Sequence, residues 1–235
     1  MRFETTQWSV VLAAGAEDTA VSRRALETLC ETYWYPLYAY VRRRGHDAEA
    51  ARDLTQGFFA AFLARRGFDA VHPDRGRFRA FLLASMKHYL SHEAARRHAL
   101  KRGSGIPPLS LGIDDAEGRY RHEPAEPVTP EHLFERRWAL TVIDRILDDL
   151  RGRWAAEDRA DEFDALKACL LGDAPPGGYE AVAARLGSTP GAVKVAVHRL
   201  RRRFHTALRA RIAETVLDPA EVDDEVRYLI DVLGR

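Results

Sequence analysis

The sequence has few of the residues that build disulfide frameworks or membrane spans. Cys30 and Cys169 are its two cysteines, too few for a disulfide framework or a cysteine metal cluster. We interpret both as buried free thiols in a reducing compartment. No apolar run is long enough to cross a membrane, and the first residues lack the basic-then-apolar pattern of a signal peptide. We therefore expect a cytoplasmic protein that makes no contact with a membrane.

The sequence signatures of common enzymes are missing as well. The chain contains no GxxxxGK[ST] phosphate-binding loop, no HExxH zinc motif, no GxSxG nucleophile motif and no CxxC pair. The histidines His88, His92 and His98 share one predicted helix, but no carboxylate or cysteine completes a plausible metal-binding set with them. We expect no catalysis, no metal site and no cofactor.

Acidic residues are absent from one stretch of the chain. No Asp or Glu occurs between Gly187 and Arg211, where Lys and Arg are frequent. The formal net charge is only +1, because residues 113–135 and the C-terminal tail are acidic while residues 78–102 and 187–211 are basic. Clustered positive charge, rather than the total, indicates nucleic-acid binding.

The acid-free stretch follows a helix and a tight corner. A helix is predicted at 179–186, and Gly187 can end it in a left-handed conformation. Thr189 can then cap a second helix, with Pro190 at its first position. This second helix has an apolar stripe at helical spacing: Val193, Val197, Leu200, Phe204 and Leu208. The pattern is typical of a helix-turn-helix, whose second helix enters the major groove of DNA; the alternative is a core helix with a solvated face.

The remaining segments also predict helices, and no segment is rich in strand-forming residues. We expect an all-α fold of two helical domains joined by a flexible linker, with the helix-turn-helix in the second domain. The Gly- and Pro-rich residues 103–130 are the expected linker between domains at 1–102 and 131–235. The last predicted helix, from about Glu221, carries an expected apolar face: Val222, Val226, Leu229, Ile230 and Leu233.

Two helices of the first domain have candidate interaction surfaces. Asp47, Glu49 and Asp53 lie at the start of one helix, where acid is favourable with the helix dipole; they are equally consistent with a docking surface for a basic partner. In the helix that begins at Phe78, aromatic and basic residues are interleaved, which suits single-stranded bases. The alternative for these aromatic residues is a place in the core.

The order of these motifs resembles that of bacterial extracytoplasmic-function (ECF) sigma factors, in the sigma-70 family of RNA polymerase subunits. The stretch LCETYWYPLYAYVRRRGHDAEAARDLTQGFFAAFL resembles the core-binding part of the family's region two. The stretch RGRFRAFLLASMKHYLSHEAARR resembles the segment that melts and captures the −10 element. The region-four helix-turn-helix that reads the −35 element is similar to YEAVAARLGSTPGAVKVAVHRLRRRF. The resemblance covers nearly the whole chain.

The resemblance implies a transcription initiation factor that binds core RNA polymerase, directs it to −35/−10 promoters and aids promoter melting. The residues that it places against the clamp helices of the polymerase are Asp47, Glu49, Asp53 and Gln56. Those on the side facing the −10 element are Arg77, Arg79, Lys87, His88 and Arg96, with the loop 71–76 around a flipped base. Those on the −35 side are Thr189, Gly191, Ala192, Lys194, His198, Arg199 and Arg202.

The chain departs from the family pattern at several positions. Gly57 stands where an acidic residue usually follows the glutamine, and Val195-Ala196 replaces a common Ser-Arg in the recognition helix. The additional segments at both ends resemble a subgroup of which some members are tied to Ser/Thr kinases, so we expect either an anti-sigma factor or such a kinase as a regulatory partner. A phosphate on Thr55 would restore negative charge beside Gly57. We also expect the acidic tail and linker to cover the basic face of 194–211 in the free protein.

Two other classes of function remain open. A stand-alone helix-turn-helix regulator would bind duplex DNA as a dimer, but it needs no acidic docking face or aromatic-basic helix. An adaptor that binds only proteins has little use for an acid-free basic helix.

Overall fold

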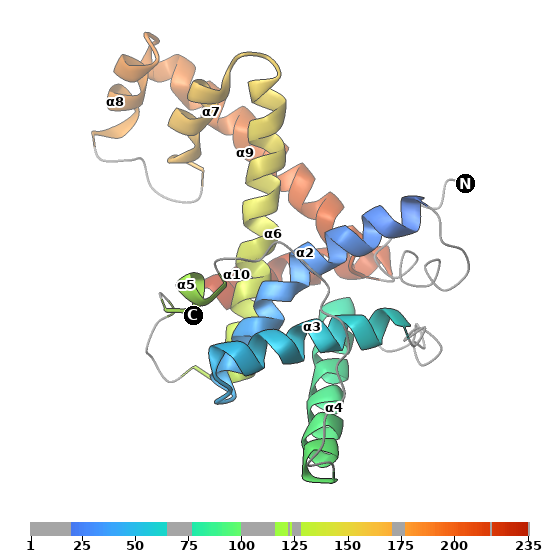
Figure 1. Ribbon diagram of the computed structural model, residues 1–235. Helices are drawn as coiled ribbons and strands as arrows, with labels where there is room; N and C mark the ends of the chain where they lie inside the picture. Colours follow the sequence, from blue (N-terminus) through green and yellow to red (C-terminus); the bar gives the residue numbers. More distant parts are fainter. Residues whose placement is uncertain are drawn as a thin grey trace. The chain divides into compact units, whose positions relative to one another are not determined.

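The described part of the chain is entirely helical. The computed structural model describes residues 20–64, 77–99, 116–121, 123, 128–170, 177–216 and 218–234. Within these ranges it contains nine α-helices, one short 3₁₀-helix and no strand (Figure 1), so the expected all-α fold class is confirmed. No helix of the described ranges is long and apolar enough to cross a membrane. The loop 71–76 and the side chain of His98 lie outside what is described.

Two compact units divide the chain. One comprises Met1–Leu140 together with Ile212–Arg235, and the other comprises Thr141–Arg211. Both boundaries fall inside long helices, α6 (Pro130–Ala155) and α9 (Pro190–Ala213). The last residues of the chain therefore belong to the first unit, whereas the expected division at residues 102 and 130 grouped them with the helix-turn-helix. The expected division into functional domains at 1–102 and 131–235 stays a prediction.

The first unit is built around α2 (Ala20–Arg43), which is lined with aromatic residues. Tyr33 and Trp34 are almost completely buried, and the Trp34 ring stacks on that of Tyr38 with centroids 5.2 Å apart. Tyr33 meets the edge of Phe78, the first residue of α4 (Phe78–Ala99), at a centroid distance of 5.4 Å. Helix α3 (Ala48–Ala64) packs on α2 and contributes Phe59, which is also fully buried. Burial of large aromatic side chains contributes most of the apolar area that stabilises such a core.

The described part of the expected linker is fastened to α2. It forms the short helix α5 (Ala116–Arg121), from which Glu117 accepts hydrogen bonds from Arg42 at 2.9 and 3.0 Å and from the Tyr38 hydroxyl at 2.6 Å. The Tyr35 hydroxyl likewise donates to Glu123 at 2.7 Å. The Arg42 guanidinium lowers the pKa of Glu117 below its usual range, which keeps the carboxylate ionised. These residues of the expected linker therefore lie against α2.

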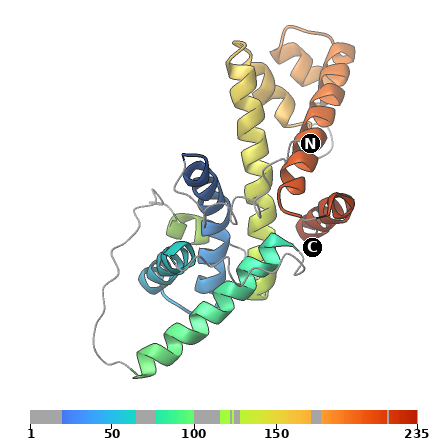
Figure 2. The ribbon, with the colours of Figure 1, turned by 90° about the vertical axis from the view of Figure 1, so that its right-hand side faces the viewer.

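The chain ends in a segment that packs in the first unit. It consists of the 3₁₀-helix η2 (Pro219–Glu221) and α10 (Val222–Gly234). The backbone N–H of Phe78 donates to the carbonyl of Thr215 at 3.2 Å, and Arg79 pairs with Glu225 of α10 at 2.7 Å, so the start of α4 lies beside these C-terminal residues (Figure 2). Four of its apolar residues are buried: Val222, Val226, Leu229 and Val232. The expectation for Ile230 is wrong, because 58% of this residue is exposed.

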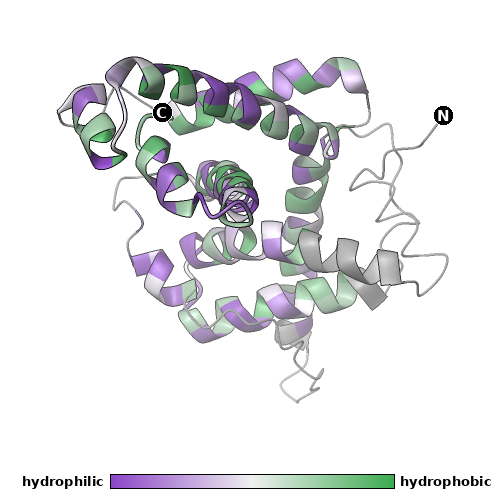
Figure 3. Ribbon diagram, turned by 90° about the horizontal axis from the view of Figure 1, so that it is seen from above, coloured by the Kyte–Doolittle hydropathy of each residue, from purple (hydrophilic) through white to green (hydrophobic). Residues whose placement is uncertain are grey.

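The second unit packs the later turns of α6 against α7 (Ala160–Lys167), α8 (Gly178–Arg185) and α9. Its core includes Trp154 and Phe163, whose rings meet edge to face at 5.9 Å. Arg201 donates to the carbonyl of Cys169 at 2.8 Å, which ties α9 to the end of the α7 region. Hydrophilic and hydrophobic residues alternate around the helices (Figure 3), as expected of amphipathic helices. Cys30 and Cys169 are both buried free thiols, as predicted.

Candidate nucleic-acid interface

The corner between α8 and α9 has the geometry that its sequence predicts. Gly187 adopts a φ of 58°, a left-handed conformation that other residues take only with strain. The N–H of Ser188 then donates to the carbonyl of Ala183 at 2.9 Å and closes the end of α8. The Thr189 hydroxyl accepts from the N–H of Ala192 at 3.2 Å, with Pro190 as the first residue of α9. The predicted cap is therefore confirmed, and it fixes where α9 begins.

Helix α9 has one buried stripe and one exposed basic face. All five apolar residues expected in the stripe are buried: Val193, Val197, Leu200, Phe204 and Leu208. All seven residues predicted for the −35 side are exposed: Thr189, Gly191, Ala192, Lys194, His198, Arg199 and Arg202. Since successive residues of a helix are about 100° apart, five of the six within α9 fall on the side away from the stripe, and Lys194 lies at the edge of the stripe. The Lys194 ammonium also lies 5.7 Å from the centre of the Tyr179 ring of α8.

The residues predicted for the −10 side separate into two groups. Arg77 and Arg79, at the start of α4, are held by the C-terminal segment. Lys87, His88 and Arg96 lie further along α4 and are wholly or partly exposed. Lys87 pairs with Glu131 at 2.8 Å and Arg96 with Glu93 at 3.5 Å, both in exposed pairs of small energetic value. The Nε2 atoms of His88 and His92 are 2.9 Å apart, within hydrogen-bonding distance.

Arg79 is enclosed rather than exposed. It is 3% exposed, and its guanidinium donates to Glu225 of α10 at 2.7 and 3.1 Å and to Glu135 of α6 at 2.7 and 2.8 Å. The ring centre of Tyr228 lies 4.1 Å from its Cζ and that of Trp138 lies 5.0 Å away. The expectation that Arg79 lies on an open face is wrong, because two carboxylates and two aromatic rings occupy all of its sides.

Glu225 is the acidic centre of the same cluster. It is fully buried and also accepts from Arg77 at 2.7 Å. Burial raises the pKa of Glu135, the second carboxylate, above its usual range, and the charge of Arg79 opposes that rise. Glu225 belongs to the acidic tail expected to cover residues 194–211, but it pairs with Arg77 and Arg79 instead. The cause is the burial of the apolar side of α10, which turns Glu225 inward with it. For the other acidic residues of the tail and linker that expectation stays a prediction.

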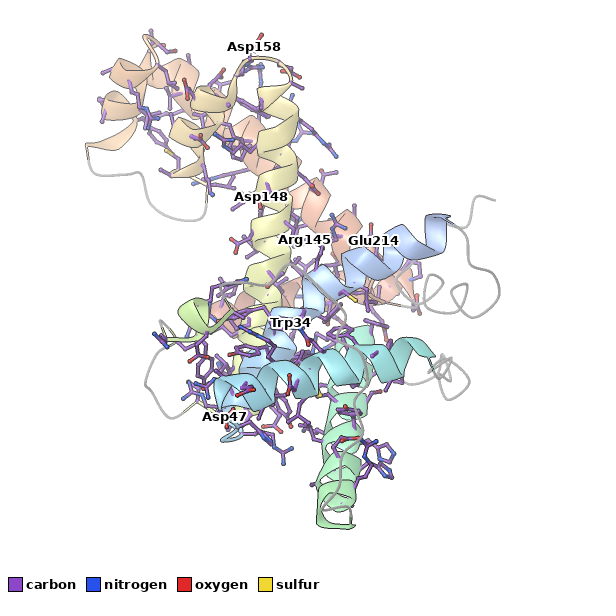
Figure 4. The ribbon with its side chains drawn as sticks, in the orientation of Figure 1. Trp34, Asp47, Arg145, Asp148, Asp158 and Glu214 are labelled. Atoms are coloured by element: carbon purple, nitrogen blue, oxygen red, sulfur yellow. The ribbon has the colours of Figure 1, made fainter. Side chains whose placement is uncertain are left out.

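The expected docking residues occupy the first turns of α3. Glu49 and Asp53 are exposed, Gln56 is partly exposed, and all three lie on one side of the helix. Asp47 precedes α3 (Figure 4), and its carboxylate accepts from the N–H of Ala50 at 2.8 Å. Asp47 is therefore an N-cap, which establishes the local role considered for it from sequence. The docking role stays a prediction for all four residues.

Thr55 faces the core of the first unit, whereas Gly57 is partly exposed and lies one helical turn after Asp53. Thr55 is fully buried, and its hydroxyl donates to the carbonyl of Ala51 at 2.7 Å. The hypothesis of phosphorylation at Thr55 is therefore wrong for this fold, because a phosphate there would need space and solvation that the core does not provide. At Gly57, an added Cβ would lie 2.5 Å from the Tyr89 hydroxyl oxygen of α4. Tyr89 of α4 therefore occupies the space that a side chain at Gly57 would need.

No group of three or more potential metal ligands comes together among the residues that the structure describes. Comparison with protein-family models, with characterised proteins and with solved structures gives no match to this chain.

The buried cluster predicts that Glu225→Gln destabilises the protein by about 2–4 kcal/mol, because Arg79 then loses one of its two carboxylates inside the core. Asp231→Asn removes the same charge from an exposed position of α10 and should change the free energy of unfolding by less than about 0.5 kcal/mol. Urea denaturation of the full chain measures both. Equal effects of the two substitutions would contradict the role assigned to Glu225.

The contact between α3 and α4 predicts a double-mutant result. Gly57→Ala should lower the free energy of unfolding by about 1–3 kcal/mol, because its Cβ meets the Tyr89 hydroxyl. In a Tyr89→Phe background the nearest atom is the ring carbon Cζ at 3.6 Å, an ordinary contact, so the same substitution should cost much less. Thermal unfolding of the wild type, the two single variants and the double variant gives the coupling free energy between the two positions. If Gly57→Ala lowers the free energy of unfolding equally in both backgrounds, this explanation is contradicted.

Proposed function

We propose that this protein is a transcription initiation factor of the ECF sigma type. It binds core RNA polymerase in the cytoplasm, brings it to promoters with −35 and −10 elements, and helps to open the DNA. The observation that carries the proposal is the basic, exposed face of α9, which contains no acidic residue and begins at a capped corner. A face of this kind is suited to phosphates and base edges.

The α8–α9 pair supports the −35 part of the proposal. In a helix-turn-helix the second helix lies in the major groove, with residues near its N-terminus against the bases. Here that end carries Gly191 and Ala192, whose small size permits close approach, followed by Lys194 and then His198 and Arg199. Cationic side chains of this spacing can reach phosphates or guanine edges on either side of the groove.

Helix α4 supports a smaller set of −10 contacts than the resemblance implies. Arg77 and Arg79 are engaged by Glu225, so we assign the −10 contacts to Lys87, His88 and Arg96, which project further along the helix. The pairs of Lys87 with Glu131 and of Arg96 with Glu93 are partly exposed and can exchange for phosphate at little cost. An anti-sigma factor or a Ser/Thr kinase is the regulatory partner that fits this proposal, with a phosphorylation site other than Thr55.

The stand-alone DNA-binding regulator is the second candidate. It would use the same face of α9, and it differs in having no need of polymerase. The acidic side of α3 favours the sigma-type function, because Glu49 and Asp53 stand exposed on one face with Gln56 and make a surface that suits a basic helical partner.

A binding assay with bacterial core RNA polymerase distinguishes the two candidates. We expect the purified protein to bind core polymerase, and Glu49→Arg with Asp53→Arg to weaken that binding by at least about tenfold, because reversed charges oppose the partner surface. Asp47 is left unchanged because it caps α3. The matched control is Asp144→Arg with Asp148→Arg, which reverses two exposed charges on α6 (Figure 4 labels Asp148).

The outcomes of this assay separate clearly. If the α3 double variant loses binding to core polymerase and the α6 double variant keeps it, docking through α3 is supported. Loss in both variants would make the effect one of net charge. If the wild-type protein does not bind core polymerase but binds duplex DNA by itself, the stand-alone regulator replaces the sigma-type proposal.

A further inference from the structure

The basic face of α9 contains an exposed apolar residue. Val195 is 50% exposed, and it and Ile230 are the large hydrophobic residues that the described part of the chain leaves exposed. Single exposed apolar residues are common on protein surfaces, so the position of Val195 carries more information than its exposure.

Val195 lies at the centre of the predicted DNA-binding face. An α-helix has about 3.6 residues per turn, so the neighbours of a residue on the helix surface are those three and four positions away. For Val195 these neighbours are Gly191, Ala192, His198 and Arg199, and all four are exposed. The face therefore has an uncharged centre, made of a glycine, an alanine and a valine, with cationic side chains around it.

Gly191 provides independent support for a close contact at this centre. Its φ is not in the left-handed region, and an added Cβ would meet nothing within 4 Å. Alanine would fit there and would favour the helix by about 0.5–1 kcal/mol. Nothing in the described part of the chain requires glycine at this position, whereas the close approach of an outside surface would favour it.

The chemistry of the major groove identifies what an exposed valine can contact. Each base pair presents hydrogen-bond donors and acceptors there, and thymine alone among the four bases adds an apolar group, its C5-methyl. Lys194, His198 and Arg199 can hold phosphates and polar base edges around that contact. Contact with a methyl group would also remove the valine side chain from water.

We propose that Val195 reads a thymine in the −35 element through the C5-methyl group of that base. This inference rests on the proposed function and adds to it a specificity-determining residue. It also gives a role to the position at which the chain departs from the Ser-Arg of the family pattern: an apolar contact replaces polar readout.

The test uses deoxyuridine, which differs from thymidine only by the missing methyl group. The full-length protein bound to bacterial core RNA polymerase first selects a sequence from a library of random duplexes. Each thymine of the selected duplex is then replaced in turn by deoxyuridine. At one position we expect the affinity of the wild-type complex to fall about fourfold, as for one methyl group returned to water. With Val195→Ala the same replacement should change the affinity by less than about 1.5-fold, because the two γ-methyl groups that reach the thymine methyl are gone.

Two further variants serve as controls. Ile230→Ala removes the other exposed apolar residue and should keep the full uridine penalty. Gly191→Ala should leave the thermal unfolding midpoint unchanged or higher, since its side chain has open space, yet it should weaken binding to every duplex. Unchanged DNA affinity of Gly191→Ala overturns the argument from close approach.

The results also separate this inference from the function on which it rests. If no sequence is selected from the library, the proposed function and the inference fail together. If a sequence is selected but no thymine shows a uridine penalty, or Val195→Ala retains that penalty in full, the inference alone fails and the sigma-type function stands.

Discussion

The first unit depends on one buried guanidinium. Arg79 of α4 connects Glu135 of α6 and Glu225 of α10, and the two acids are 56 and 146 residues away from it in the sequence. A buried charge is tolerated only when it is paired and hydrogen-bonded, so each of these three segments requires the other two. The C-terminal helix is therefore a structural part of the unit that holds α2, α3 and α4, and the first turn of α4 is committed to contacts within the protein.

This arrangement gives the separated charges of the chain different roles. The acid on the inner side of α10 neutralises arginines of α4, while the acids of α3 stay exposed and available to a partner. On α9 the cations surround an uncharged centre and contain no acid among them. A net charge near neutrality thus conceals an acidic surface on α3 and a basic one on α9, and the proposed function uses both.

Local rules predicted a large part of this structure from the sequence. The all-α class, the buried stripe of α9, the cap at Thr189 and the free cysteines follow from helical spacing and capping chemistry, which involve residues close together in the chain. Arg79, Thr55, Gly57 and Ile230 could not be placed in this way. The sequence around an arginine in a helix is the same whether its side chain meets solvent or a distant glutamate. At Gly57, the space for a side chain is limited by Tyr89 of another helix. Those contacts are set by tertiary packing.

The most direct test of the sigma-type function is transcription in vitro from a library of templates with random upstream sequence. Bacterial core RNA polymerase is assayed with and without the full-length protein, and the 5′ ends of the transcripts are sequenced. The account predicts that the protein creates new start sites, preceded by one shared sequence block near −35 and another near −10. Start sites identical to those of core polymerase alone would contradict it.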